Sequence, residues 1–566
     1  MFNGIDLTFF LGYFVLVVAI GFLSGRKQRK TVSGYFRGGN RLPFYAIGFS
    51  IVAAGISSEQ FVGEVGYAYK LGMPVANWEW SVFPALSLLL WIFIPLYYRN
   101  RITTMPEYLE RRFGGEVRTL YAILLILSYV LVNFAVVFYT GGYALEVMWG
   151  FPKLYAVWAL ALITGLYTIY GGLTAVAWTG SFQCILLMGG GLYVFFSGMN
   201  LIGWDFQAIL GEGTRAHLIT PADHEVPWTA LAIMLLTVHV WYYANNQYIN
   251  QRCLAARSEW HAKMGILVAM GLQILLPLAT TFPGMVYRVI NPDLIQSDAS
   301  YPMMVSAVVP TGLRGLVAAA IVGAIMSTIS GLVNSTSTLV TLDLYQRWSK
   351  KRILEDKLVR VGRWSGGIAL LIGACIAPLV MKWENLFRYA QDIWVPMASP
   401  VVVVFLCAAL WPRATQRGAL ACLWLSILTI PFIIGKTILA DYEIRFLPEN
   451  LENPLVFAGV VTMMAVIFMA VSSKHRSLTA DLGLSVLLVI PIALLAVWSP
   501  EIIAVLVLCL LAFSILWLCS KRLDPVESMW DRSMLSGMSG AAWIANIWIW
   551  WTLAALIMAA IYIYFW

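Results

Sequence analysis

Long apolar runs alternate with short polar connections along the whole chain. Runs of roughly 18 residues or more are long enough to cross a lipid bilayer as helices. We predict sixteen spans, at 5–25, 44–73, 75–98, 118–148, 153–172, 175–201, 228–251, 264–290, 313–345, 364–381, 385–411, 418–439, 454–471, 480–498, 501–519 and 540–566. The first lacks a basic leading segment and a small-residue cleavage site, so we interpret it as a retained span. The pattern predicts an all-α polytopic membrane protein.

One apolar run, 44–73, carries a polar segment at mid-depth. Residues 55–64 read GISSEQFVGE, with two carboxylates, an amide, two hydroxyls and two glycines. Such groups are expensive in lipid and normally face a cavity or a partner. A helix interrupted by small polar residues at the bilayer centre is typical of transporters. Other polar groups inside spans, which one shared cavity would satisfy, are Glu79, 239–250, Gln273, 324–341 and 388–392.

Composition and charge narrow the class further. Of the 566 residues 60% are hydrophobic and 12% are charged, a balance that excludes a soluble protein. With the N-terminus outside, the cytoplasmic loops, together with Arg118 at a span end, carry 28 of the 37 lysines and arginines, as the positive-inside rule requires. We therefore predict both termini outside, in the plasma (inner) membrane, and the net charge of +8 needs no nucleic-acid partner. The seven cysteines form no CxxC pair, so we expect no disulfide framework and no zinc site.

Six strings along the chain resemble motifs of one family. They lie at 51–63, 105–113, 170–179, 246–252, 334–345 and 389–391. In this order they resemble the sodium/solute symporters, within them the sodium/glucose cotransporter branch and most of all its bacterial galactose-transporting members. The resemblance covers about residues 5–412, and six strings in order are specific where one would not be.

The resemblance implies a fold, the five-plus-five inverted repeat of the LeuT type. We divide the chain accordingly into an extra N-terminal span with its loop (1–43), a first repeat (44–201), an extracellular loop (202–227), a second repeat (228–412) and peripheral C-terminal spans (413–566). The expected partners are membrane lipid and a small-molecule substrate, with the protein a monomer or a homodimer.

The resemblance also implies a sodium site, the only metal expected. Its oxygens would come from backbone carbonyls and two hydroxyls, at Ala53, Ile56, Ala324, Ser327 and Thr328. Taken alone, the adjacent hydroxyls of Ser327 and Thr328 leave an alternative open, in which both bond back to their own helix. Where many sugar-transporting members carry an aspartate on the sodium exit route, this chain has Gly180. We therefore expect one sodium ion per cycle.

The expected substrate site combines retained and changed positions. Gln60, Glu79 and Gln391 match the sugar-binding pattern, whereas His239 replaces an asparagine, Gln273 a lysine, and Glu64 an apolar outer residue. The expected gate residues are Tyr242, Trp241, Tyr243, Phe387 and Trp78. Carboxylate and carboxamide groups suit a polyhydroxylated ligand, and the altered charge favours an amino-bearing sugar or a polyol. Structural roles remain open for Glu79 as a paired acid, Tyr242 as core packing and His239 as a satisfied core histidine.

These observations predict a sodium-coupled symporter that imports a sugar or polyol by alternating access. An uncoupled facilitator of the same fold is one alternative, because of Gly180. Another is a symporter for a different solute: an amino sugar, an amino acid, a carboxylate or a nucleobase. A receptor or an enzyme is disfavoured, because no signalling module follows residue 520 and the five histidines show no HxxxH pairing.

Overall fold

The structure is a computed structural model of an all-helical chain. It describes residues 3–566 except 28, 58, 222, 229–230, 232–233, 350–352, 381–385, 441–453, 473–527, 532–533 and 535–544. Within the described part a single isolated bridge, between Leu42 and Ala256, is the only strand-like pairing. Ten described helical segments are long and apolar enough to cross a bilayer. The protein is thus an integral, multi-pass membrane protein.

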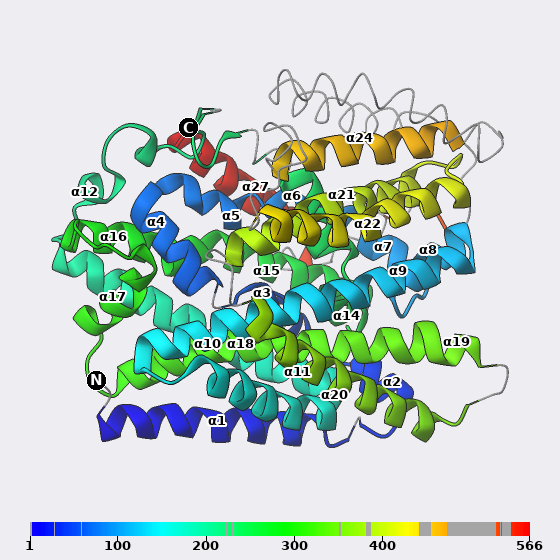
Figure 1. The fold of residues 1–566 in the computed structure, drawn as a ribbon, viewed down its shortest axis with the longest axis horizontal. Coiled ribbons are helices and arrows are strands. Elements are labelled where there is room, and N and C mark those ends of the chain that lie inside the picture. The colour runs from blue at the N-terminus through cyan, green and yellow to red at the C-terminus, as the bar shows by residue number, and fades with distance from the viewer. Residues whose placement is uncertain are drawn as a thin grey trace.

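The long helices form a bundle. They are α1 (Gly4–Gly25), α9 (Gly115–Leu127), α10 (Phe134–Trp149), α11 (Lys153–Leu201), α15 (Glu259–Thr280), α18 (Leu313–Thr338), α20 (Glu355–Val380), α21 (Leu386–Leu410), α22 (Gln416–Ala440), α24 (Pro454–Ser472) and α27 (Ile547–Tyr564). Figure 1 shows α1 and α24 at opposite faces of this bundle, nearly parallel to each other. Among the described helices, α18 and the 393–410 part of α21 are the most deeply buried, and α18 packs against α11, α1 and α20.

Shorter helices connect or extend the long ones. They are α2 (Val32–Arg37), α3 (Phe44–Gly55), α4 (Val65–Leu71), α5 (Asn77–Trp80), α6 (Phe83–Leu88), α7 (Ile94–Arg99), α8 (Met105–Phe113), α12 (Phe206–Leu210), α14 (Gln247–Leu254), α16 (Phe282–Ile290), α17 (Ser300–Val308) and α19 (Gln346–Trp348). The 3₁₀ turns are η1 (Gly38–Asn40), η3 (Met73–Ala76), η6 (Gly213–Ala216) and η9 (Ser297–Ala299). Six π-helical segments, a type that often marks functional sites, are η2 (Glu59–Glu64), η4 (Leu89–Phe93), η5 (Ser128–Asn133), η7 (Leu235–His239), η8 (Trp241–Asn245) and η10 (Leu339–Tyr345).

Most predicted spans coincide with these helices. The two predicted at 153–172 and 175–201 form one element, α11, broken at Gly172 with φ 63° and ψ −157°. A side chain at Gly172 would collide with the backbone of Tyr35, so this break requires glycine. The predicted spans 480–498 and 501–519 lie outside the described residues, and the total of sixteen stays a prediction.

Two helices are interrupted inside the bundle. The first, α3, ends at Gly55, and Ile56 is extended with φ −99° and ψ 129° before the chain resumes helical structure at η2. The second ends at Asn245, and Asn246 is extended with φ −79° and ψ 134° before α14. The breaks are neighbours, because the Tyr248 hydroxyl lies 3.4 Å from the Ala54 carbonyl oxygen. Together they bring backbone carbonyls outside the regular helical bonding pattern to one place, where side chains donate to them.

The loops gather at the two ends of the bundle. At one end Asp6, near the N-terminus, accepts from the Gly312 amide at 2.7 Å. The C-terminal Phe565 carbonyl accepts from the Leu218 amide at 2.7 Å, and a Lys70–Glu225 ion pair of 2.7 Å ties that loop to α4. Both termini therefore lie at one end, on the left of Figure 1.

The predicted cytoplasmic loops meet at the other end. The Val32 amide donates to Glu355 at 3.1 Å, and the Arg112 guanidinium donates to the Trp411 carbonyl at 2.9 Å. Across the same end the Arg347 guanidinium donates to the Gly115 carbonyl at 2.6 Å. The arginine-rich loops thus form one face of the molecule, as their charge predicts.

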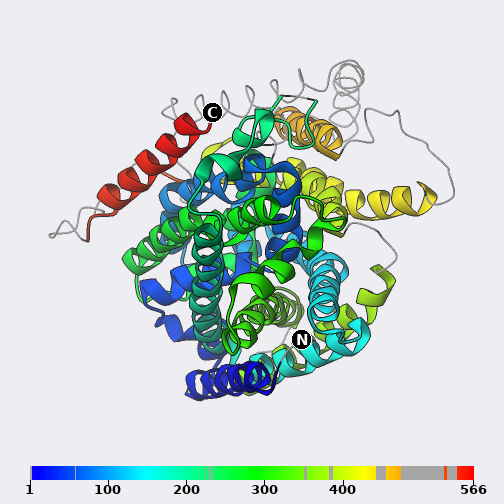
Figure 2. The ribbon, with the colours of Figure 1, turned by 90° about the vertical axis from the view of Figure 1, so that its left-hand side faces the viewer.

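The C-terminal helices cover the outside of the bundle. α22 and α24 pack on α21, and α27 lies at the periphery in Figure 2. α27 is held by polar contacts, since the Tyr562 hydroxyl donates to Asn77 at 2.8 Å and the Trp551 indole to Ser87 at 3.0 Å. Its outer face exposes Leu556 and Ile563, as a lipid-facing helix does.

Candidate functional site

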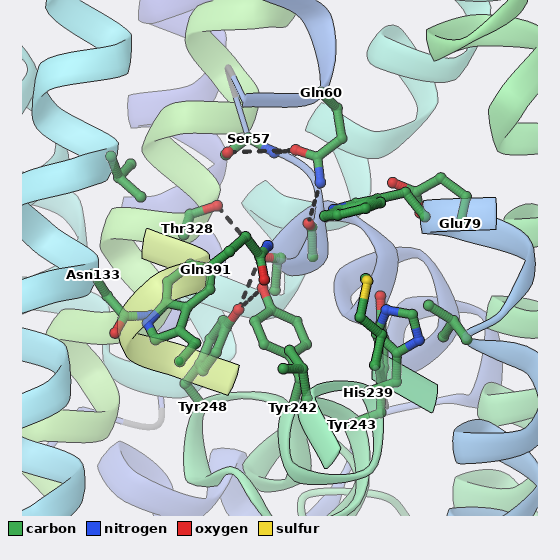
Figure 3. A pocket seen from close by; sticks show the side chains of 18 residues that line it. Ser57, Gln60, Glu79, Asn133, His239, Tyr242, Tyr243, Tyr248, Thr328 and Gln391 are labelled. Carbon is green, nitrogen blue, oxygen red and sulfur yellow. Dashed lines mark hydrogen bonds between the residues drawn. The ribbon is translucent and has the colours of Figure 1, made fainter. Parts of the chain in front are cut away.

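A cavity of about 70 Å³ lies between the two broken helices, in the middle of the bundle (Figure 3). This volume holds a few waters and is smaller than typical ligand pockets, so the site is contracted in this conformation. Its lining residues are Ala54, Gly55, Ser57, Gln60, Trp78, Glu79, Val82, Asn133, Val137, Met234, Val238, His239, Tyr242, Tyr243, Tyr248, Thr328, Gln391 and Trp394. Segments far apart in the sequence therefore meet at one site, as the buried polar groups predict.

The first broken helix supplies one wall. The Gln60 side-chain oxygen accepts from the Ser57 amide at 2.8 Å, and its nitrogen donates to the Gly55 carbonyl at 3.2 Å. These bonds fold the Gln60 side chain back over the break, where Figure 3 shows it next to Ser57. The carboxamide thereby satisfies backbone groups that the interruption leaves unpaired.

A buried carboxylate forms a second wall. Glu79 lies on α5 and is 4% exposed. The Gln273 amide nitrogen on α15 donates to the Glu79 carboxylate and lies 3.5 Å from the Tyr243 hydroxyl. Gln273 does not line the cavity; it stands behind Glu79 and orients it. The carboxylate thus presents a fixed acceptor to the cavity.

His239 and Gln391 add polar groups on other sides. The His239 Nδ1 atom lies 3.2 Å from the Ser81 hydroxyl, a bond that fixes the ring orientation. Gln391 on α21 turns its amide toward the tyrosines in Figure 3, and its buried side-chain oxygen has no bonded partner among the described residues. An unmatched acceptor beside a cavity can accept a bond from a ligand hydroxyl.

Aromatic rings close the side of the second broken helix. Tyr242 and Tyr248 meet edge to face at 5.3 Å with their hydroxyls in contact, and Tyr243 packs beside Tyr242 at 5.1 Å. Trp78 lines the cavity from α5. Trp241 is fully buried and lies outside the lining, with its ring 6.4 Å from that of Tyr242. The Phe387 side chain lies outside the described part of the chain.

Glu64 lies behind the cavity. Its Oε1 atom accepts from the Thr281 hydroxyl at 2.6 Å and the Thr280 hydroxyl at 3.0 Å. The side chain is 4% exposed and is absent from the cavity lining. Its carboxyl group nevertheless lies within hydrogen-bonding range of that of Glu79.

A cluster of uncharged oxygens surrounds the first break. The Thr328 hydroxyl lies 3.3 Å from the Ala54 carbonyl, 3.4 Å from that of Ile56 and 3.3 Å from that of Ala324. Hydroxyl bonds are usually 2.7–2.8 Å, so this single hydroxyl donor is shared, at longer distances, among three carbonyl acceptors. The neighbouring Ser327 hydroxyl is buried without a partner among the described residues. Several neutral oxygens around one point suit a small hard cation such as sodium.

This cluster differs in detail from the predicted set. The sequence analysis named Ala53, whereas the oxygen that approaches Thr328 belongs to Ala54. The alternative left open above, in which both hydroxyls bond back to their own helix, holds for Thr328, which donates to the Ala324 carbonyl at 3.3 Å, but not for Ser327. Gly180 borders the cluster, because a side chain there would begin 3.2 Å from the Ser327 hydroxyl.

Sequence reasoning missed three participants. Asn133 lines the cavity from η5 and accepts from the Ser128 hydroxyl at 3.2 Å. The Asn133 side-chain amide lies inside the predicted apolar span 118–148, and a polar group inside a span is the same signal that pointed to Glu79. Tyr248 and Ala54 sit inside recognised strings, but only the fold shows that they meet.

No group of three histidine, cysteine, aspartate or glutamate residues that could hold a metal ion occurs in the described part. A bundle of membrane-spanning helices with a polar cavity between two broken helices is the architecture of secondary transporters. A model of the sodium:solute symporter family matches residues 35–426. The chain belongs to the sodium:solute symporter family, which is a family of transporters and not of enzymes.

Similar proteins agree with this assignment. The sodium/glucose cotransporter of Vibrio parahaemolyticus is 30% identical over 510 residues, covering 83% of this chain and 91% of that protein. The sodium/myo-inositol cotransporter 2 of Oryctolagus cuniculus is 33% identical over 461 residues, covering 73% and 67%. A solved Na+-coupled sialic acid symporter in a substrate-bound outward-open state aligns with a TM-score of 0.71 and 22% identity, covering 84% of this chain and 99% of that chain. The predicted LeuT-type fold class is confirmed.

Proposed function

We propose that this protein is a sodium-coupled symporter that imports a sugar or sugar-like polyol by alternating access. The single observation that carries the proposal is the cavity in which Gln60, Glu79 and Gln391 converge from three helices. Carboxylate oxygens accept bonds from hydroxyl groups, and carboxamides both donate and accept. The two curated relatives described above are named as cotransporters of a hexose and of a cyclic polyol.

In this proposal the Tyr242 and Tyr243 rings supply the apolar surface for the C–H face of a sugar. His239 contributes a polar edge, Trp78 the outer aromatic wall, and Gln273 the support for Glu79. A gating role for Trp241 and Phe387 stays a prediction. A hydroxyl pattern that leaves one of these buried groups unpaired is penalised, and this penalty gives selectivity.

Sodium is the coupling ion in this proposal, and it is transported together with the solute. The oxygens of Ala54, Ile56, Ala324, Ser327 and Thr328 would bind it at the first break. Ala53, the original prediction, is one residue away. This site joins α3 to α18, and each comes from a different half of the chain. Sodium binding therefore favours one relative arrangement of the two halves.

We further propose the repeat division 44–201 and 228–412. It is supported by the position of the two breaks, because each interrupts the first long helix of its half with an extended residue, Ile56 or Asn246. Rocking of the first helix of each half would open the cavity alternately to the two sides. Moving Tyr242 away from Tyr248 then frees the solute toward the arginine-rich end.

The charge distribution supports an orientation. The end with arginine-rich loops faces the cytoplasm, and both termini lie outside in the plasma (inner) membrane. The membrane potential then adds to the sodium gradient, at about 2.3 kcal/mol per charge and 100 mV.

Uptake into proteoliposomes tests the proposal. A panel of labelled hexoses, amino sugars and polyols is offered with and without an inward sodium gradient. Accumulation above equilibrium only with the gradient supports symport and names the solute class. Equilibration independent of sodium would identify a facilitator instead, and sodium-driven uptake of only an amino acid or nucleobase would overturn the sugar assignment.

A further inference from the structure

Two buried carboxyl groups from different helices meet at the edge of the cavity. Glu64 comes from η2 and Glu79 from α5, and each side chain is 4% exposed. Their carboxyl groups lie within hydrogen-bonding range of each other. The Glu64 Oε1 atom is matched by two threonine hydroxyls, but its buried Oε2 atom has no donor among the described residues.

An ionised carboxylate can only accept hydrogen bonds. Two ionised carboxylates that face each other in a dry site therefore repel and cannot bond, and one of such a pair normally keeps a proton. The contacts of the pair come from Thr280, Thr281, Gln60 and Gln273, and no lysine or arginine is among them in the described part. A donor is missing between the two groups.

A proton supplies the missing donor between Glu64 and Glu79 better than a metal cation does. A sodium ion needs several oxygen ligands, whereas Gln273 presents an amide nitrogen to Glu79. The Gln60 side-chain oxygen is already bonded to the Ser57 amide. The space on the other side of Glu79, beside Trp80 and Met270, has no room for a water molecule. A proton needs neither extra ligands nor extra volume.

We propose that Glu64 and Glu79 share one proton and form a proton-binding site beside the solute cavity. This site is separate from the sodium cluster and goes beyond the proposed symport. The shared proton supplies the missing donor only while the two helices are close. Closure of the cavity therefore takes up a proton, and opening, which separates and hydrates the carboxyl groups, releases it.

Other titratable groups near the pair must be distinguished from it. His239 and Tyr243 face the cavity beside Glu79. Five elements that pack on η2 bring further titratable groups. η9 carries Asp298, α17 carries Tyr301, and α10 carries Tyr139 and Tyr143. α4 carries Tyr67, Tyr69 and Lys70, and α15 carries Glu259, His261 and Lys263. Of these, Tyr139 and Tyr143 lie against Lys153, and Lys263 pairs with Glu259. Carboxyl spectroscopy separates the pair from the histidines, tyrosines and lysines, because only carboxylic acids give the signal measured.

The test is infrared spectroscopy of the purified full-length protein without sodium or solute. We expect a carbonyl-stretch band of a protonated carboxylic acid at neutral pH. Both Glu64→Gln and Glu79→Gln should abolish this same band, because removing either acid lets the other ionise. Glu225→Gln, which removes an exposed glutamate paired with Lys70, should leave the band unchanged.

Two results would overturn the shared proton. The first is the absence of the band from the wild type, which would mean that both acids are ionised. The second is a full band in either variant, which would mean that burial alone protonates the remaining acid. If one variant does not fold, the other variant decides, together with a single-step loss of the wild-type band in alkali. Neither result depends on transport, so the outcome is independent of the symport proposal.

Discussion

Removing one hydroxyl at the first break should weaken sodium binding in a measurable way. The Thr328 hydroxyl lies 3.3–3.4 Å from three backbone carbonyl oxygens. In Thr328→Ala the cluster loses one of its five oxygens, and the carbonyls have no substitute in the dry interior. A hydrogen-bond-type contact to a charged group is worth about 1.5–3 kcal/mol. Because 1.4 kcal/mol is a factor of ten, we expect the half-saturating sodium concentration to rise about 10- to 100-fold.

The assay is sodium dependence of uptake, supported by sodium dependence of thermal unfolding. The second readout needs no transport, because a ligand that binds only the folded state raises the unfolding temperature with its concentration. Thr328→Ser keeps the oxygen and should remain within about twofold of wild type. Thr338→Ala is the matched control, since that buried hydroxyl on the same helix donates to the Asn334 carbonyl at 2.7 Å, one turn back on its own helix. Unchanged sodium stabilisation in Thr328→Ala would refute the sodium site.

Three further perturbations probe other parts of the structure. Gln273→Lys places a cation beside Glu79, so uptake of amino sugars should fall about tenfold relative to neutral sugars, measured by competition. Asp343→Asn breaks the 2.7 Å pair between the buried Asp343 carboxylate and Arg118, whose side chain is 14% exposed and also pairs with Glu110, and should lower the free energy of unfolding by about 1.5–3 kcal/mol, measured by thermal unfolding. Gly180→Asp adds a carboxylate beside the sodium cluster and should lower the half-saturating sodium concentration about tenfold, measured in uptake.

Each of these has a control and a contrary outcome. Gln273→Met keeps the volume without the charge, and equal selectivity in the lysine and methionine variants would exclude an electrostatic cause. Glu146→Gln removes an exposed partner of Lys153 and should lower the free energy of unfolding by about 1 kcal/mol or less. If Asp343→Asn lowered the free energy of unfolding by no more than this control does, the Asp343–Arg118 pair would not be needed for stability. Gly180→Asn adds bulk without charge, and tighter sodium binding in that variant would rule out the carboxylate as the reason.

The sequence predicts the fold well because its strongest signals are local. The length of each apolar run predicts a membrane span. The polar segment 55–64 predicts the first break, because a lipid-facing helix would not carry so many polar groups. The polar run 239–250 marks the second break in the same way. The placing of Gln60 and Glu79 in one cavity follows from the same reasoning, because one shared cavity satisfies polar groups that are costly in lipid. These inferences depend on composition within a single helix.

Other features depend on how helices rotate against each other, which the sequence does not specify. Trp241, Tyr242 and Tyr243 are consecutive, yet only the two tyrosines line the cavity, because neighbouring residues on a helix point in different directions. The sequence predicts that Glu64 lines the cavity, but its side chain accepts hydrogen bonds from Thr280 and Thr281, more than 200 residues away in the chain. The π-helical segments η2, η5, η7 and η8 also shift the register of their side chains.

Arg252 and Gly180 approach the same buried hydroxyl, that of Ser50. Its guanidinium is fully buried, with Nε 2.7 Å from the Ser50 hydroxyl and Nη2 without a partner among the described residues. Arginine stays charged in proteins, and a buried charge without a counter-ion is costly. A side chain at Gly180 would begin 3.5 Å from the same Ser50 hydroxyl and 3.2 Å from that of Ser327. A carboxylate there would therefore reach both the arginine and the sodium cluster, and we expect the aspartate of Gly180→Asp to offset the positive charge of Arg252 beside that cluster.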